Sequence, residues 1–277
     1  KGNIAAFDAI KEDLKKSLSS QEGITQEDSS SHLLLKRKIS LNDITFTYPG
    51  KSSPAVNNLN MIIPANSIIG LVGASGSGKS TTIDLLLGLL TPNSGNLFID
   101  DTSINIDNKR SWQNTLGFVP QSIFLSEGTI AENVAFGLAK KDINLEQVKK
   151  ALQLANMMEL VQDLPNGVNT KVGERGVQLS GGQRQRIGIA RALYNEADVL
   201  VFDEATSALD GITERIIMES IHNLSGKKTI IMIAHRLKTV QKCDIIYMMD
   251  KGKVIAQGSY QELIKNNIMF KEMAEHS

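Results

Sequence analysis

"GASGSGKST", residues 73–81, stands between an apolar run and a run with helical periodicity. The run before it, "SIIGLVG", predicts a strand, and "KSTTIDLLLGLL" after it predicts a helix that we expect Pro92 to end. The stretch fits the pattern G-x-x-x-x-G-K-[ST], in which glycines let main-chain amides approach phosphate oxygens and the helix start adds a positive field. It therefore predicts a phosphate-binding loop. A glycine- and serine-rich turn with a solvated lysine is the alternative.

We expect this loop to bind the phosphates of a nucleotide. The Lys79 ammonium can reach the β- and γ-phosphates, which makes it a candidate catalytic residue, and the Ser80 hydroxyl can coordinate Mg²⁺. The predicted nucleotide-binding residues are Gly73, Ala74, Ser75, Gly76, Ser77, Gly78, Lys79, Ser80 and Thr81.

Polar side chains follow three further predicted strands at the points where those strands end. After "VLVF", Asp203 is expected to hold Mg²⁺ through a water and Glu204 to polarise the attacking water. His235 follows "IIMIA", and Gln121, which follows "LGFVP", could ligate Mg²⁺ and the attacking water. Each of these residues alone has an ordinary explanation as a surface side chain. In parallel α/β sheets, however, ligands lie beyond the carboxyl ends of the strands, so the shared placement favours one site.

The first predicted strand, "ISLNDITFTY", covers residues 39–48. Its apolar residues Ile39, Leu41, Ile44 and Phe46 fall roughly on one face, together with Tyr48. Because Tyr48 stands at the strand end, ahead of a Pro-Gly turn, it could stack on a purine. It could equally be an ordinary strand aromatic.

Strands alternate with helices along the chain, which predicts an α/β protein. "DVLVFDE" and "KTIIMIAH" are continuous apolar runs, as expected of strands buried on both faces of a parallel sheet. A mostly helical region at about 122–195, which ends in a helix over 180–195, is expected to form an inserted subdomain. Residues 243–259 predict a hairpin that turns at Lys251-Gly252.

Composition restricts the function classes. Thirty basic and thirty acidic residues give a formal net charge of zero, which argues against a nucleic-acid binder. A single cysteine, Cys243, excludes an internal disulfide, and no apolar run reaches membrane-helix length. Residues 1–32 are expected to be a terminal helix over 1–16 and a serine-rich linker, or else a frayed terminus, ahead of a globular domain at 33–277. Because the chain begins with Lys1, we expect it to be part of a longer polypeptide.

"VQLSGGQRQR", residues 177–186, has the features of a second phosphate-binding helix start. Ser180 stands three residues before Gln183, which is a capping box and would explain a plain helix start. Capping alone does not need the two glycines between them. A second phosphate site cannot easily serve the same nucleotide in the same chain. We therefore expect two copies of the chain to face each other head to tail, with ATP between the 73–81 loop of one and the 179–183 segment of the other.

With "LSGGQ" at 179–183 and the other motifs in order, the chain from about Leu33 onward resembles the nucleotide-binding domain of an ATP-binding cassette (ABC) transporter. The resemblance implies a P-loop NTPase core with a mostly parallel sheet, an N-terminal antiparallel β subdomain and an inserted helical subdomain that carries the signature. "TKVGERG", residues 170–176, is similar to a loop found in exporters. More specifically, residues 111–137 resemble proteins that flip lipid-linked oligosaccharides or polysaccharides.

The resemblance also implies roles for single residues. Tyr48 is the implied adenine-stacking aromatic, Gln121 the glutamine that senses Mg²⁺ and the membrane domain, Glu204 the catalytic base and His235 a contact of the γ-phosphate. Ser180, Gly182 and Gln183 are implied contacts of the γ-phosphate bound to the partner domain. Asp210, in "SALD" at 207–210, is implied to link two protomers.

The implied partners are a second nucleotide-binding domain and a transmembrane domain of the same full-length chain, whose coupling helix would dock on residues 126–137. Residues 1–16 would be the cytosolic end of the last membrane helix, which places the domain at the cytoplasmic face of the cell membrane. The implied activity is ATP hydrolysis with Mg²⁺, coupled to transport. Three alternatives stay open: a soluble ABC ATPase of DNA repair, chromosome maintenance or translation, an importer ATPase, and an inactive regulatory module.

Overall fold

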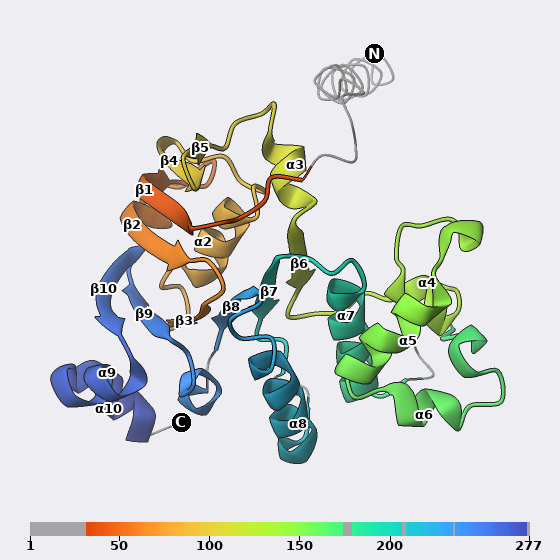
Figure 1. Ribbon diagram of the computed structural model, residues 1–277. Helices are drawn as coiled ribbons and strands as arrows, with labels where there is room; N and C mark the ends of the chain where they lie inside the picture. The colour runs from red at the N-terminus through yellow and green to blue at the C-terminus, as the bar shows by residue number, and fades with distance from the viewer. Residues whose placement is uncertain (1–31, 174–178, 207–208, 235, 276–277) are drawn as a thin grey trace, which may run out of the picture.

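The computed structural model describes residues 32–173, 179–206, 209–234 and 236–275 (Figure 1). Several predictions lie outside these residues: the helix over 1–16 and its linker, residues 174–176 of the 170–176 loop, the first two residues of "SALD", and His235. The described residues form two sheets and a group of helices beside the larger sheet. Among them, no helix is both long enough and apolar enough to cross a membrane.

The larger sheet has the strand order β10-β9-β3-β8-β7-β6. Its strands are β3 (Ile68–Val72), β6 (Leu116–Val119), β7 (Val199–Asp203), β8 (Thr229–Ile233), β9 (Ile245–Asp250) and β10 (Lys253–Gly258). All adjacent pairs are parallel except β9 and β10, which form an antiparallel hairpin. The hairpin turns at Lys251 and Gly252, both with positive φ (46° and 75°), as the sequence predicts. The parallel order brings the carboxyl ends of β3, β8, β7 and β6 to one edge of the sheet.

The smaller sheet is antiparallel, with the order β2-β1-β4-β5. Its strands are β1 (Lys38–Phe46), β2 (Val56–Pro64), β4 (Ser94–Ile99) and β5 (Thr102–Ser103). The register of β1 against β2 shifts between Leu41 and Ile44, which explains why these residues are both buried although they are three positions apart. Tyr48 lies beyond the end of β1 and is 39% exposed, so it does not share the buried face that the sequence predicts for it together with Ile39, Leu41, Ile44 and Phe46.

Helices cover both sheets and form a group between β6 and β7 in the chain (Figure 1). The α-helices are α2 (Lys79–Leu86), α3 (Lys109–Gln113), α4 (Ile130–Val134), α5 (Leu145–Leu154), α6 (Met158–Gln162), α7 (Gly181–Tyr194), α8 (Gly211–His222), α9 (Tyr260–Asn266) and α10 (Ile268–Glu275). Short 3₁₀ turns are η1 (Lys140–Asp142), η2 (Gly167–Asn169) and η4 (Leu237–Val240). Helices α4, α5 and α7 pack on one another, and α7 also packs on β6, so the helical group is joined to the sheet through α7.

The sequence predicts that this helix ends near Pro92, but helix α2 ends at Leu86. The reason is Gly88, whose φ of 67° is left-handed and cannot continue an α-helix. The amides of Gly88 and Leu89 then donate to the carbonyls of Leu85 and Asp84, which closes the last turn. The apolar periodicity of 83–90 continues past this break and hides it.

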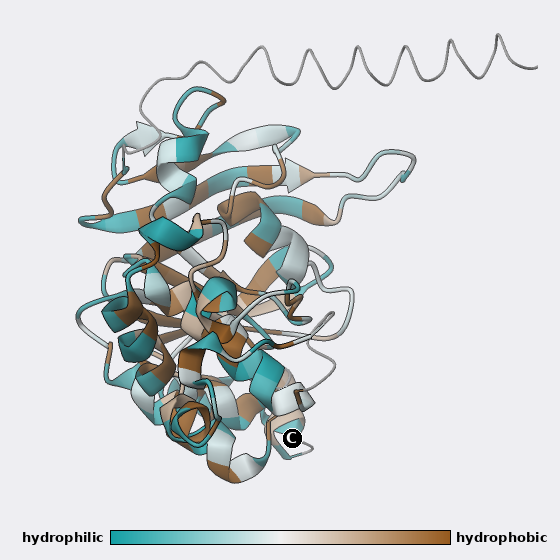
Figure 2. Ribbon diagram, turned by 90° about the vertical axis from the view of Figure 1, so that its right-hand side faces the viewer, coloured by the Kyte–Doolittle hydropathy of each residue, from teal (hydrophilic) through white to brown (hydrophobic). Residues whose placement is uncertain are grey.

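Two hydrophobic cores lie on the two faces of the larger sheet. Along β3, Ile68 and Val72 belong to one core, while Ile69 and Leu71 belong to the other. A strand buried on both faces needs apolar residues at every position, which explains the continuous apolar runs. Figure 2 shows the hydrophobic segments gathered along these inner strands and the helices that cover them.

Replacing Gly117 with alanine is expected to lower the free energy of unfolding by about 1–3 kcal/mol, because it overpacks the junction of β6 and α7. A Cβ at this position would lie 2.6 Å from the carbonyl oxygen of Ala192 and 2.8 Å from Leu200 Cδ2. Urea unfolding followed by circular dichroism measures the change. Gly211→Ala is the matched control, since a Cβ there meets nothing within 4 Å. Equal stability of the two variants would contradict the close packing of α7 on β6.

Candidate active site

The loop 73–78 joins the end of β3 to the start of α2. Three glycines in it have left-handed φ: Gly73 (148°), Gly76 (76°) and Gly78 (101°). A Cβ on Gly73 would lie 2.2 Å from the Met249 carbonyl oxygen, and one on Gly78 would lie 2.6 Å from that of Ala55. These two glycines are therefore required by the packing of the protein itself, which the sequence pattern does not reveal.

Lys79 opens α2 and is buried, with 5% of its surface exposed. Its Nζ donates to the carbonyl oxygens of Gly73 at 2.8 Å and Ala74 at 2.9 Å, so the ammonium lies against the inside of the loop. Burial lowers the pKa of Lys79, while the negative charges of Glu204 and Asp203 act in the opposite direction. The lysine is thus in the electrostatic field of the carboxylates that follow β7.

Gln121 and Glu204 meet at the edge of the larger sheet. Gln121 Nε2 donates to Glu204 Oε2 at 2.8 Å, although the two residues are 83 positions apart. The Glu204 amide donates to the carbonyl of Ile233, the last residue of β8, at 3.2 Å. The residues that follow β6 and β7 are therefore held together beside the end of β8. Glu204 has a left-handed φ of 49°, which is uncommon outside glycine and re-aims the chain as it leaves β7.

Three predicted Mg²⁺ ligands carry oxygen donors. Asp203 is half-buried at the end of β7, whereas Ser80 and Gln121 are exposed. Hydroxyl, carboxylate and amide oxygens suit Mg²⁺, which keeps several waters and uses few protein ligands. The donor set fits the ion, and Mg²⁺ coordination by these residues stays a prediction.

Tyr48 lies beside the start of α2. Its hydroxyl is 3.2 Å from Thr81 Oγ1, and its ring meets that of Phe46 edge to face at 4.9 Å between centroids. The ring is thereby fixed next to the predicted phosphate-binding loop, while the residue stays partly exposed to solvent. This placement suits the predicted stacking on a purine.

The second predicted phosphate site begins α7 with the capping box that its sequence indicates. Ser180 Oγ accepts from the Gln183 amide at 3.2 Å, and Gln183 Oε1 accepts from the Ser180 amide at 2.8 Å. Gly181 and Gly182 form the first turn of α7. In the described part of the chain, no hydrogen bond joins residues 179–183 to the loop 73–81. A single chain does not link its two predicted phosphate sites through such contacts.

Asp210 caps the start of α8, where its carboxylate accepts from the amides of Thr213 at 3.0 Å and Ile212 at 3.1 Å. The hydrogen bonds from Thr213, and then that from Ile212, hold the pKa of Asp210 below its usual value. The residue stays ionised at neutral pH and is exposed. An exposed carboxylate at a helix start agrees with the predicted role between protomers and does not test it.

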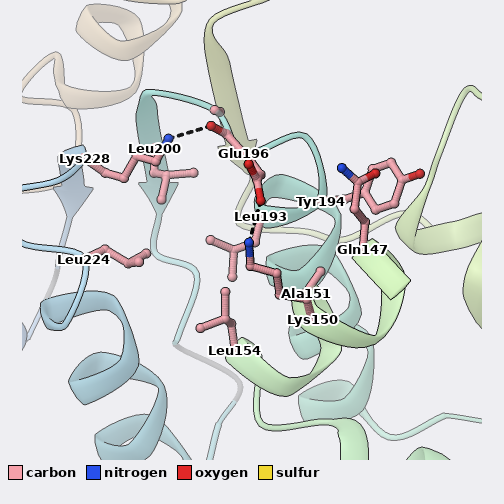
Figure 3. A pocket seen from close by; sticks show the side chains of 11 residues that line it. Gln147, Lys150, Ala151, Leu154, Leu193, Tyr194, Glu196, Leu200, Leu224 and Lys228 are labelled. Carbon is pink, nitrogen blue, oxygen red and sulfur yellow. Dashed lines mark hydrogen bonds and ion pairs between the residues drawn. The ribbon is translucent and has the colours of Figure 1, made fainter. Parts of the chain in front are cut away.

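A pocket of about 200 Å³ lies elsewhere, between α5, the end of α7 and β7 (Figure 3). Glu196 stands at its rim, where its carboxylate binds Lys150 Nζ at 2.5 Å and its carbonyl oxygen accepts from Lys228 Nζ at 2.6 Å. None of the predicted nucleotide or metal ligands lines this pocket, so it is separate from the loop 73–81.

Sequence reasoning assigned no role to Arg191, but the structure places it in contact with residues 126–137, the predicted docking surface for a coupling helix. Its Nε donates to the Asn133 carbonyl at 2.9 Å and its Nη1 to the Phe124 carbonyl at 3.0 Å, while its guanidinium lies 4.5 Å from the centre of the Phe136 ring. These contacts join the signature helix α7 to residues 126–137. One signal was available: Arg191 is a lone cation in the apolar run "IGIARALY".

The sequence profile described as "ABC transporter" matches residues 56–207, more than half of the chain. The chain belongs to the ABC transporter family. The matched range includes the 73–81 loop, the signature and Glu204.

Several relatives place the ABC chain among exporter-type proteins. It is 39% identical over 251 residues to the ATP-dependent lipid A-core flippase of Photorhabdus laumondii subsp. laumondii, covering 90% of this chain and 43% of the flippase. It is 40% identical over 231 residues to the heterocyst differentiation ATP-binding protein HepA of Nostoc sp., covering 83% of this chain and 38% of HepA. A solved bacterial Atm1-family ABC exporter with ATP bound superimposes with a TM-score of 0.83 at 35% identity, covering 89% of this chain and 43% of that one.

The predicted family and fold are confirmed: the chain is an ATP-binding domain of the exporter type, and so an ABC-type ATPase. The mostly parallel sheet, the N-terminal antiparallel sheet and the helical insertion are those of this ABC fold. The chain spans about two fifths of the length of the relatives it matches.

Proposed function

We propose that this ABC domain binds Mg·ATP between two copies, hydrolyses it and so drives export by a membrane-embedded transporter. The observation that carries the proposal is the group at the strand ends: Gln121 is bound to Glu204, and the charge of Glu204 acts on the buried ammonium of Lys79. One charged donor for phosphate oxygens, one carboxylate base and one amide at the same sheet edge are the parts that phosphoryl transfer needs.

Each residue has a distinct part in the proposed reaction. Lys79 moves from the loop carbonyls to the β- and γ-phosphates and offsets their charge. Glu204 orients a water for in-line attack and accepts its proton, while Gln121 keeps that carboxylate in place. Ser80, Asp203 and Gln121 would hold Mg²⁺, which supplies charge neutralisation on the phosphate oxygens when bound. His235 would contact the γ-phosphate.

In this proposal, the second phosphate site of one copy contacts the nucleotide that is bound to the other copy. The exposed start of α7, with Ser180, Gly182 and Gln183, would meet the γ-phosphate held by the other copy, and Asp210 would lie between protomers. A nucleotide that contacts both copies favours only the closed dimer, which couples binding and hydrolysis to motion. This arrangement explains why one chain has two helix starts suited to phosphate.

Replacing Ser180 with arginine should leave ATP binding by the single chain intact but block dimer formation and hydrolysis. The arginine side chain would fill the space at the start of α7 that the partner's nucleotide needs. Light scattering on Glu204→Gln, which should retain bound ATP, measures the mass with and without Mg·ATP. We expect a monomer that becomes a dimer only with Mg·ATP, and no such change when Ser180→Arg is added.

Glu146→Arg, an exposed change on α5, is the matched control for the added arginine. Loss of ATP binding by Ser180→Arg itself, measured by a nucleotide titration, would show that the signature serves its own chain. That result would overturn the two-chain arrangement.

The membrane partner and cargo form a second part of the proposal. Phe136, within residues 126–137, is 51% exposed, and Phe124, just before them, is 61% exposed. We propose that this surface receives a coupling helix of the transmembrane domain at the cytoplasmic face of the cell membrane. The relatives named as lipid A-core flippases support a lipid-linked oligosaccharide or polysaccharide as the cargo class. ATP-dependent movement of such a lipid by the complete transporter in proteoliposomes, absent for the Glu204→Gln form, tests the cargo.

A further inference from the structure

We propose that Glu214 is a positioning residue that fixes the loop after β7 relative to the loop after β8. Its Oε1 accepts from the Thr206 hydroxyl at 2.9 Å, and its Oε2 pairs with Arg236 Nη1 at 3.1 Å. Thr206 stands two residues after Glu204, and Arg236 directly follows His235. One carboxylate therefore holds both loops that carry the proposed base and γ-phosphate contact. The inference rests on the proposed function of those two residues.

The need for such a link follows from where the sheet ends. Strands β7 and β8 are paired up to Asp203 and Ile233, and in the described part of the chain the Glu204 amide makes the last main-chain bond to this ladder, at 3.2 Å. Beyond it the two loops leave the sheet, and main-chain pairing no longer sets their separation. Glu214 supplies the next link from the first turn of α8, with only 18% of its side chain exposed. A largely buried carboxylate with a separate partner on each oxygen fixes distance and direction.

The same helix start connects these loops to the proposed dimer interface. Asp210 caps α8 and Glu214 lies four residues later, so both belong to one helical turn. A partner that displaces Asp210 would shift the start of α8, and with it both catalytic loops.

The two contacts of Glu214 differ in exposure, which allows them to be tested separately. Glu214 and Arg236 line an open groove of about 630 Å³ between α8 and η4, and the Arg236 side chain is 58% exposed. Solvent and salt weaken an ion pair of this kind. Glu214→Gln removes the charge facing Arg236 but keeps an oxygen that can accept from Thr206, whereas Glu214→Ala removes both contacts.

The experiment compares steady-state ATP hydrolysis and ATP binding for Glu214→Ala, Glu214→Gln and the unchanged protein. We expect kcat to fall about 10- to 100-fold in Glu214→Ala, since a small misplacement of reacting groups has effects of this size, with KM and ATP affinity changed by no more than about twofold. Glu214→Gln should recover part of the lost rate. Glu219→Ala is the matched control, because Glu219 is an exposed carboxylate on the same helix and groove; its kcat should stay at that of the unchanged protein.

A second measurement separates positioning from a general structural effect. If Glu214 acts through Glu204, adding Glu214→Ala to Glu204→Gln should lower the residual rate by less than about twofold, because residues that act as a unit are not additive. Should Glu214→Ala fail to fold, Thr206→Val and Arg236→Gln each remove one contact and should each lower kcat at unchanged ATP affinity.

The outcomes for the two proposals are distinguishable. If the unchanged protein is active and Glu214→Ala keeps full activity, the role of Glu214 is overturned while the proposed function stands. The same holds if Glu214→Ala loses kcat and ATP affinity equally. Full additivity with Glu204→Gln also overturns it. An unchanged protein that hydrolyses no ATP overturns the proposed function itself.

Discussion

Replacing Lys79 with alanine is expected to lower kcat for ATP hydrolysis by about 100-fold or more and to weaken ATP binding. The variant loses the charged donor aimed at the phosphates, and removing a single preorganised donor from a charge-stabilising site has effects of this size. It also leaves the carbonyls of Gly73 and Ala74 without the ammonium that now binds them. Both losses act on the proposed phosphate-binding loop.

Steady-state hydrolysis and a nucleotide titration measure the two effects of Lys79→Ala, and circular dichroism checks that the fold is kept. Lys265→Ala is the matched control, since it removes an exposed lysine from α9, far along the chain from the loop. Full activity of Lys79→Ala would contradict the assignment of residues 73–81 as the phosphate-binding loop.

Replacing Glu204 with glutamine is expected to lower kcat by about 10²- to 10⁴-fold while ATP binding persists. The amide cannot accept a proton from the attacking water, and general-base catalysis contributes rate factors of this order. Its remaining oxygen can still accept from Gln121 Nε2, which now lies 2.8 Å from the carboxylate, so the geometry of the site should survive. Phosphate release at saturating Mg·ATP measures the rate.

Glu159→Gln is the control for Glu204→Gln, because it makes the same chemical change on the surface of α6. If Glu204→Gln hydrolysed ATP at the rate of the unchanged protein, another group would have to orient the water. That result would also contradict the proposed role of Gln121, because Gln121 acts through the Glu204 carboxylate.

The fold was predictable where its signals depend on neighbours along the chain. The loop after β3, the two-residue turn at Lys251-Gly252 and the capping box of Ser180 each need contacts within a few residues. The end of α2 is the counterexample, because the apolar period runs on through Leu90 while Gly88 adopts a left-handed φ. There a single local conformation overrides a longer pattern.

The candidate site was predictable as a set but not as a geometry. That Gln121, Asp203 and Glu204 follow strands can be read from the sequence, and the rule for parallel sheets places them at one edge. Which of them touch depends on strand order. The order β3-β8-β7-β6 is what brings Gln121 to Glu204 and the carboxylates into the field of Lys79.

The sequence by itself determined the family and the start of the signature helix, and it predicted the phosphate-binding loop and the class of chemistry. These depend on residue type at short spacing, where the chain cannot change the relation between neighbours. Only the tertiary structure decided that Gly73 must be glycine because of the Met249 carbonyl, that Arg191 joins α7 to residues 126–137, and that Glu214 bridges two loops. Contacts between residues far apart in the chain follow from how strands and helices pack, and no local pattern encodes them.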